Sequence, residues 1–223
     1  AAFREATWEE AMARASGALV RLRDTHGPEA LAGFGSAKGS NEEAYLFQKL
    51  VRTGFGSSNV DHCTRLCHAS SVVALLEGIG SGAVSNPVMD VTQAEVVILI
   101  GANPTVNHPV AASFIKNATK SGTKLIVMDP RRSDLARVAH RFLQFKPDTD
   151  VAMLNAIMHV IVDEGLVDAA FIAERTTGYE ALRKNVEGYS PEAMAPICGI
   201  DAETLRDVAR LYARSKASMI LWG

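Results

Sequence analysis

The spacing of hydrophobic positions predicts an α/β protein. Four short apolar runs occupy 96–100, 124–128, 142–145 and 218–222. Helical periodicity fills the intervals, at 110–120, after Ser133, at 150–164 and, as two or three helices, at 168–214. Continuous apolar runs are typical of parallel strands that helices cover on both faces. We therefore expect a doubly wound, mainly parallel, Rossmann-like sheet with helices on both faces.

The first 60 residues predict a smaller βα piece. Thr7 and Glu10 form the pattern of a capping box, so a helix should run from there to about residue 25. A short strand at 30–35 and a helix that Asn41 caps, ending at residue 52, should follow. One strand cannot close a sheet. We expect 1–60 to be a partial segment of a discontinuous α/β domain and 61–223 to be a separate α/β domain that binds a ligand.

Polar residues follow three of the predicted strands. They are Gly101 and Asn103, then Asp129, Arg131 and Arg132, then Asp148 and Asp150. Ligands of open α/β sheets bind beyond the carboxyl ends of the strands. The Asp129 carboxylate could accept a hydrogen bond from a ribose or a guanine, and the two arginines could hold phosphate. The helix that starts at Asp150 has free N–H groups that suit an anionic or polar ligand.

These strand ends together indicate a nucleotide-bearing cofactor. The G-x-G-x-x-G fingerprint is absent after the first strand, which disfavours an ordinary nicotinamide site. The alternative is that all three segments are only turns, since Gly, Asn, Pro and Asp are common at strand ends.

A second group of reactive side chains lies at His62, Cys63, Cys67 and His68. The two cysteines are four residues apart, and no second pair follows, so a structural zinc site is disfavoured. A thiol nucleophile with a histidine base is also possible in principle, although such partners generally meet in space and not along the chain. Cys198, His26, His140 and His159 are interpreted as ordinary core or surface residues.

Composition narrows the class of protein. The 223 residues are 48% hydrophobic and 22% charged, with a net charge of -2, so the chain can bury a core and has no basic surplus for nucleic acid. The apolar runs are too short to span a membrane. Three cysteines, an odd number, favour a reducing compartment, and we expect a cytoplasmic protein. The absence of a signal sequence and of an initial Met suggests a piece of a longer chain.

The run from Val60 to Val72, Val-Asp-His-Cys-Thr-Arg-Leu-Cys-His-Ala-Ser-Ser-Val, resembles the active-site signature of molybdenum or tungsten formate dehydrogenases. In that family a cysteine or selenocysteine binds the metal, and a histidine follows at once. The resemblance covers essentially the whole chain, through 36–42, 99–104, 107–109, 128–131 and 220–223. Related nitrate reductases generally have another residue after the ligand, so His68 favours formate.

The resemblance implies roles for ten residues. Cys67 would be the metal ligand, and Cys67 and His68 would be the catalytic pair. The residues that would contact molybdopterin guanine dinucleotide are Lys38, Gly101, Asn103, Asn107, Asp129, Arg131, Asp148 and Asp150. Lys38 aligns only approximately with the basic residue of the family. The cofactor would be molybdenum or tungsten with two such dinucleotides, and the reaction would interconvert formate and carbon dioxide.

The family resemblance also implies partners. The rest of the catalytic subunit would carry an iron–sulfur cluster that this chain lacks, and iron–sulfur or flavin subunits would receive the electrons. We therefore expect the piece alone to be inactive and to hold no cofactor. Two alternatives remain within the superfamily, an enzyme of the nitrate reductase type and a non-catalytic iron–sulfur subunit of an NADH dehydrogenase. A plain α/β binding module, with its cysteines buried as small hydrophobic residues, is a third.

Overall fold

The computed structural model describes residues 3–223. It contains two compact units, one that ends at Ser85 and one from Asn86 to Gly223. The predicted division at residues 60 and 61 concerns domains of a whole subunit, and it stays a prediction. No helix within residues 3–223 is both long enough and apolar enough to cross a bilayer.

The first unit is built around two short parallel strands. Its elements are α1 (Trp8–His26), η1 (Pro28–Ala30), β1 (Gly33–Gly35), α2 (Asn41–Lys49), the π-helical η2 (Leu50–Phe55), β2 (Val60–His62), α3 (Thr64–Cys67) and α4 (Ala69–Ile79). β1 and β2 pair in parallel, with Gly33 opposite Val60. A sheet of two strands agrees with the expected βα piece, although β2, α3 and α4 were not predicted.

Two helix starts in this unit differ from the predictions. Thr7 caps α1 as expected, accepting from the Glu10 N–H at 3.2 Å, but the Glu10 carboxylate pairs with Arg4. The prediction that Asn41 caps α2 was wrong by one residue. Ser40 is the cap, because its hydroxyl accepts from the Glu43 N–H at 3.2 Å while the Glu43 carboxylate accepts from the Ser40 N–H at 2.6 Å. The complete capping box therefore belongs to α2.

The second unit is a four-stranded parallel sheet with the order β5-β4-β3-β6. Its strands are β3 (Val96–Ile100), β4 (Lys124–Met128), β5 (Arg141–Leu143) and β6 (Ser218–Trp222). Its helices are η3 (Val88–Gln93), α5 (Pro104–Asn107), α6 (Pro109–Lys120), η4 (Asp134–Arg137), α7 (Asp150–Asp163), α8 (Ala169–Arg175), α9 (Tyr179–Val186), α10 (Pro191–Cys198) and α11 (Ala202–Ala213).

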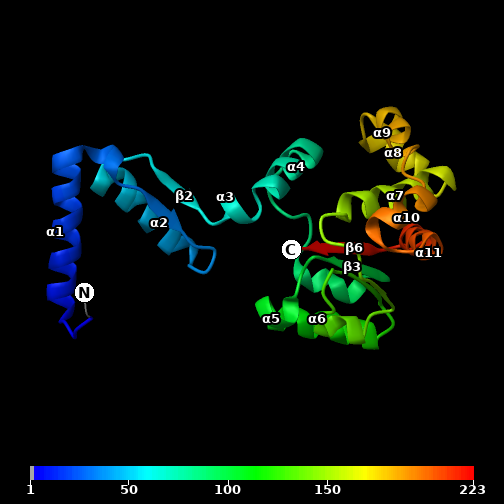
Figure 1. The fold of residues 1–223 in the computed structure, drawn as a ribbon, viewed down its shortest axis with the longest axis horizontal. Coiled ribbons are helices and arrows are strands. Elements are labelled where there is room, and N and C mark those ends of the chain that lie inside the picture. Colours follow the sequence, from blue (N-terminus) through cyan, green and yellow to red (C-terminus); the bar gives the residue numbers. More distant parts are fainter. Residues whose placement is uncertain (1–2) are drawn as a thin grey trace. The chain divides into compact units, whose positions relative to one another are not determined.

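Both faces of this sheet are covered by helices. Alternate side chains of a strand point to opposite faces. Val96 and Ile98 of β3 accordingly pack with α7, α10 and α11, whereas Val97 and Leu99 pack with α6 and η3. Figure 1 shows α7, α10 and α11 on one side of β3 and β6, and α5 and α6 on the other. The predicted doubly wound α/β fold is confirmed.

The predicted elements of this unit are largely confirmed. Three strands have the predicted bounds, but the strand expected at 142–145 lies at Arg141–Leu143. Between residues 168 and 214 there are four helices instead of two or three. They are short because each has its own start, a polar cap at Asp168, Ser190 and Asp201 and a left-handed glycine at Gly178.

Candidate functional site

The carboxyl ends of the parallel strands bring two predicted site residues to one edge of the sheet. Beyond β3, the Gly101 N–H donates to the Met128 carbonyl at 3.0 Å. Beyond β4, the Asp129 N–H donates to the Leu143 carbonyl at 3.1 Å. These bonds continue the strand ladders past the last strand residues. Gly101 and Asp129 therefore follow adjacent, hydrogen-bonded strands at the same edge.

Gly101 shapes the start of the loop after β3. Its φ angle is +61°, in the left-handed region, and a Cβ built there would meet no atom within 4 Å. Glycine is therefore favoured here by backbone conformation, and the space beside it is open. Asn103, half-buried, stands at the N-cap position of α5, where its Oδ1 accepts from the Thr105 hydroxyl at 2.7 Å and not from a backbone N–H. Asn107 is the last residue of α5 and is exposed.

The segment after β4 combines a buried carboxylate with exposed guanidinium groups. Asp129 is only 6% exposed, and its Oδ1 accepts from the Arg131 N–H at 2.7 Å. Arg131 and Arg132 are both exposed, but Arg132 lies over the ring of Phe142, 5.3 Å from its centroid. Arg131 has no such aromatic partner among residues 3–223 and is the better candidate to hold a phosphate.

Ser133 is a candidate that was not predicted as a site residue. Its Oγ is buried and has no hydrogen-bond partner among the described residues. A buried hydroxyl without a partner costs free energy, and such groups are rare in folded proteins. The sequence signal was its position, two residues after Arg131 in the same strand-end loop.

The segment after β5 is held by α10 and contains an unusual backbone conformation. The Lys146 N–H donates to the Cys198 carbonyl at 2.8 Å, and its Nζ donates to the Pro196 carbonyl at 2.9 Å. Asp148 has a φ angle of +66°, the one positive value at a non-glycine residue within 3–223. Such conformations are uncommon and often occur at ligand sites. Asp148 and Asp150, the first residue of α7, are both exposed.

The predicted catalytic pair lies in the first unit. Cys67 is the last residue of α3, and its side chain is exposed. His68 joins α3 to α4, is half-buried, and places its Nδ1 3.3 Å from the Ser71 Oγ. This contact with Ser71, a residue that was not predicted to take part in the site, orients the imidazole. Lys38 also belongs to this unit and is exposed in the loop after β1.

The side chains just before Cys67 bond to one another. The Asp61 carboxylate accepts from Arg65 Nε at 2.7 Å, and this bond, with a second from the His62 N–H, lowers the pKa of Asp61. His62 Nδ1 lies 2.9 Å from the Thr64 hydroxyl. Within residues 3–223 no group of three or more His, Cys, Asp or Glu side chains is placed to hold a metal ion.

Comparison with known proteins extends this description. The family model described as "Molybdopterin oxidoreductase" matches residues 2–223. Formate dehydrogenase H of Escherichia coli K12 is 41% identical over 218 residues, which cover 97% of this chain and 30% of that protein. The F420-dependent formate dehydrogenase 1 subunit alpha of Methanococcus maripaludis is 42% identical over 218 residues, 98% of this chain and 32% of that protein.

A solved structure shares the fold. Acetylene hydratase from Pelobacter acetylenicus aligns with a TM-score of 0.81 and 26% identity, over 99% of this chain and 30% of that one. The chain thus spans about a third of the length of the relatives it matches. Because one relative is a hydratase and the others are dehydrogenases, the fold alone does not determine the reaction.

Proposed function

Because the chain belongs to the molybdopterin oxidoreductase family, we propose that it is part of the catalytic subunit of a formate dehydrogenase. The reaction would be oxidation of formate to carbon dioxide, or its reverse. The observation that carries this proposal is 41–42% identity to two formate dehydrogenases along nearly the whole chain, together with the adjacent Cys67 and His68.

The side chains of the second unit suit a nucleotide-bearing cofactor. The sheet edge offers a buried carboxylate at Asp129, a buried Ser133 hydroxyl that has no partner within residues 3–223, an exposed guanidinium at Arg131, and open space beside Gly101. These groups match the ribose or guanine donors, the phosphates and the close backbone approach that a dinucleotide requires. We propose that they hold one molybdopterin guanine dinucleotide of a bis-dinucleotide molybdenum or tungsten cofactor.

Further contacts to the cofactor are proposed from the family likeness. Asn103 and Asn107 lie on α5 or at its cap, and Asp148 and Asp150 lie at the start of α7, where free N–H groups favour polar or anionic atoms. Lys38 would contribute a positive charge from the first unit. The left-handed backbone at Asp148 supports the proposal that this turn contacts a ligand.

Cys67 is proposed as the protein ligand to the metal. Its exposed thiol is a soft donor, which suits a metal already bound by dithiolene sulfurs, and coordination would remove the thiol proton. When bound, the metal centre would accept the two electrons that formate releases as it becomes carbon dioxide and a proton. His68, held by Ser71, would orient formate or receive that proton.

The partners and location follow from the same proposal. The electrons would pass to an iron–sulfur cluster elsewhere in the subunit and then to iron–sulfur or flavin subunits. The M. maripaludis relative is named as a subunit alpha, which supports a multi-subunit assembly. We propose a cytoplasmic enzyme, and we expect residues 1–223 alone to be inactive.

The experiment compares full-length wild type with Cys67→Ala and, as a matched control, Cys63→Ala. Molybdenum and tungsten are measured by mass spectrometry, and formate-dependent dye reduction is assayed. Wild type and Cys63→Ala should contain metal and reduce the dye, whereas Cys67→Ala should lose activity. A wild type without metal and activity would identify a non-catalytic relative. Nitrate-dependent oxidation of reduced dye tests the nitrate reductase alternative.

A further inference from the structure

A cavity lies at the edge of the sheet where the strands begin, opposite the edge that carries Gly101 and Asp129. It has a volume of about 700 Å³ and is lined by residues before and at the starts of β3 and β4 and by the end of α11 with the turn that leads to β6. None of the residues predicted to contact the dinucleotide lines it. Its volume lies within the range of about 300–1,000 Å³ that is usual for small-molecule sites.

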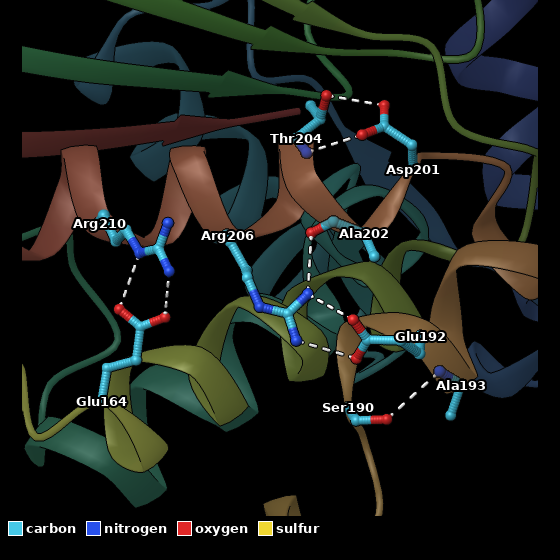
Figure 2. A network of polar contacts seen from close by, with 9 residues as sticks. All are labelled: Glu164, Ser190, Glu192, Ala193, Asp201, Ala202, Thr204, Arg206 and Arg210. Carbon is cyan, nitrogen blue, oxygen red and sulfur yellow. Dashed lines mark hydrogen bonds and ion pairs between the residues drawn. The ribbon is translucent and has the colours of Figure 1, made fainter.

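The charge of this cavity is positive. Lys124, Arg210 and Arg214 line it, against one carboxylate, Glu95. Figure 2 shows that Arg210 is held by Glu164, through bonds of 2.8 Å from Nε and 2.7 Å from a terminal nitrogen. This pairing lowers the pKa of Glu164, so the carboxylate stays ionised and neutralises Arg210.

Lys124 and Arg214 remain available to a ligand. Neither side chain forms a hydrogen bond or an ion pair within residues 3–223, and both are exposed. By contrast, Glu95 is partly engaged, because its carboxylate accepts from the Lys216 N–H at 2.9 Å. The Thr123 hydroxyl donates to the Ala94 carbonyl at 2.8 Å and can still accept a bond. With Arg210 paired to Glu164, the lining holds two cations and one carboxylate, so its remaining charge is still positive.

We propose that this cavity binds a small anion of the phosphate class, with Lys124 and Arg214 as its charged contacts. Arginine binds phosphate oxygens in a forked geometry, and lysine acts as a point charge. Ser121, in the turn between α6 and β4, supplies a hydroxyl beside these cations, whereas the Thr123 hydroxyl already donates to the Ala94 carbonyl. The volume also leaves room for a small organic group attached to the phosphate.

The test uses the full-length protein with its cofactor, in a chloride buffer at low ionic strength. Binding of inorganic phosphate and of ribose 5-phosphate is measured by calorimetry. Lys124→Gln with Arg214→Gln should weaken binding roughly 100-fold, because removal of each charge-assisted hydrogen bond weakens it about tenfold. The control, Lys116→Gln with Arg175→Gln, removes two exposed cations outside the cavity and should bind as wild type does.

A further variant should change the affinity for phosphate in the opposite direction. Glu95→Gln removes the one negative charge of the lining, while its amide oxygen can still accept from Lys216, so phosphate should bind more tightly. Circular dichroism establishes that each variant is folded. Tighter binding of ribose 5-phosphate than of phosphate supports an organic phosphate as the natural ligand, and equal binding supports recognition of the phosphate group alone.

Three results would overturn the proposal. The first is that neither phosphate compound binds the wild type. The second is that the Lys124 and Arg214 double variant binds phosphate as tightly as the wild type does. The third is that hexaglutamate binds and the phosphate compounds do not, which would assign the cavity to an acidic segment of another polypeptide.

Discussion

Replacement of Gly101 separates backbone strain from steric clash at the predicted cofactor edge. The φ angle of +61° is unfavourable for any residue with a Cβ, but a Cβ at this position would touch no atom within 4 Å. Gly101→Ala should therefore cost only the left-handed conformation, about 1–2 kcal/mol. Gly101→Asn should cost less, because asparagine visits this region more readily.

Hydrogen–deuterium exchange of the full-length protein measures this cost locally. Amides of β3 and of the Gly101 loop should open about 5- to 30-fold more often in Gly101→Ala, the factor that corresponds to 1–2 kcal/mol. Gly188→Ala is the matched control, since its φ is not positive and its added Cβ also meets nothing within 4 Å. It should be neutral or slightly stabilising. Equal exchange in wild type and Gly101→Ala, or faster exchange in Gly101→Asn than in Gly101→Ala, would refute the reasoning.

Two further predictions concern α11. Leu205 is fully buried, so Leu205→Ala should destabilise the second unit by about 3 kcal/mol. The control is Leu182→Ala, at a residue that is 43% exposed, which should cost less than about 1 kcal/mol. The rate of hydrogen–deuterium exchange in α7 and α11 measures both costs. The pKa of Asp201 is lowered, chiefly by the Thr204 N–H, so its cap stabilises α11 fully above the unfolded pKa of about 3.9 and is lost as the pH falls through the lower folded value. Asp201→Asn should keep the cap and abolish this acid sensitivity, and unchanged sensitivity would contradict the assignment.

β3 and β4 could be predicted because each is a largely apolar run buried on both faces, and β6 because its apolar run is continuous although it is partly exposed. Residues 60–62, in contrast, form a strand only by pairing with Gly33–Gly35, and no local sequence pattern indicates this pairing. The cap of α2 was misplaced because Ser40 and Asn41 are both good capping residues. Local sequence thus predicts buried elements well and predicts elements that depend on distant pairing poorly.

The candidate site, like the fold, could be predicted only in part. Gly101 and Asp129 could be assigned to one edge of the sheet, because the carboxyl ends of parallel strands lie at the same edge. The unpaired hydroxyl of Ser133 and the left-handed backbone of Asp148 depend on how the loops pack, and residue type does not reveal them. The roles of Cys67 and His68 came from family resemblance and not from spacing.

The strand order has a consequence for synthesis on the ribosome. β3 lies between β4 and β6, yet Ser218, which pairs with Val96, is made about 120 residues later. At a synthesis rate of about 5–20 residues per second, one edge of this apolar strand waits roughly 6–24 seconds for its partner. An unpaired apolar edge can pair with other chains. The nascent chain is therefore expected to need a chaperone during that interval, and mutations in β6 should reduce the yield of soluble protein more than those in β5.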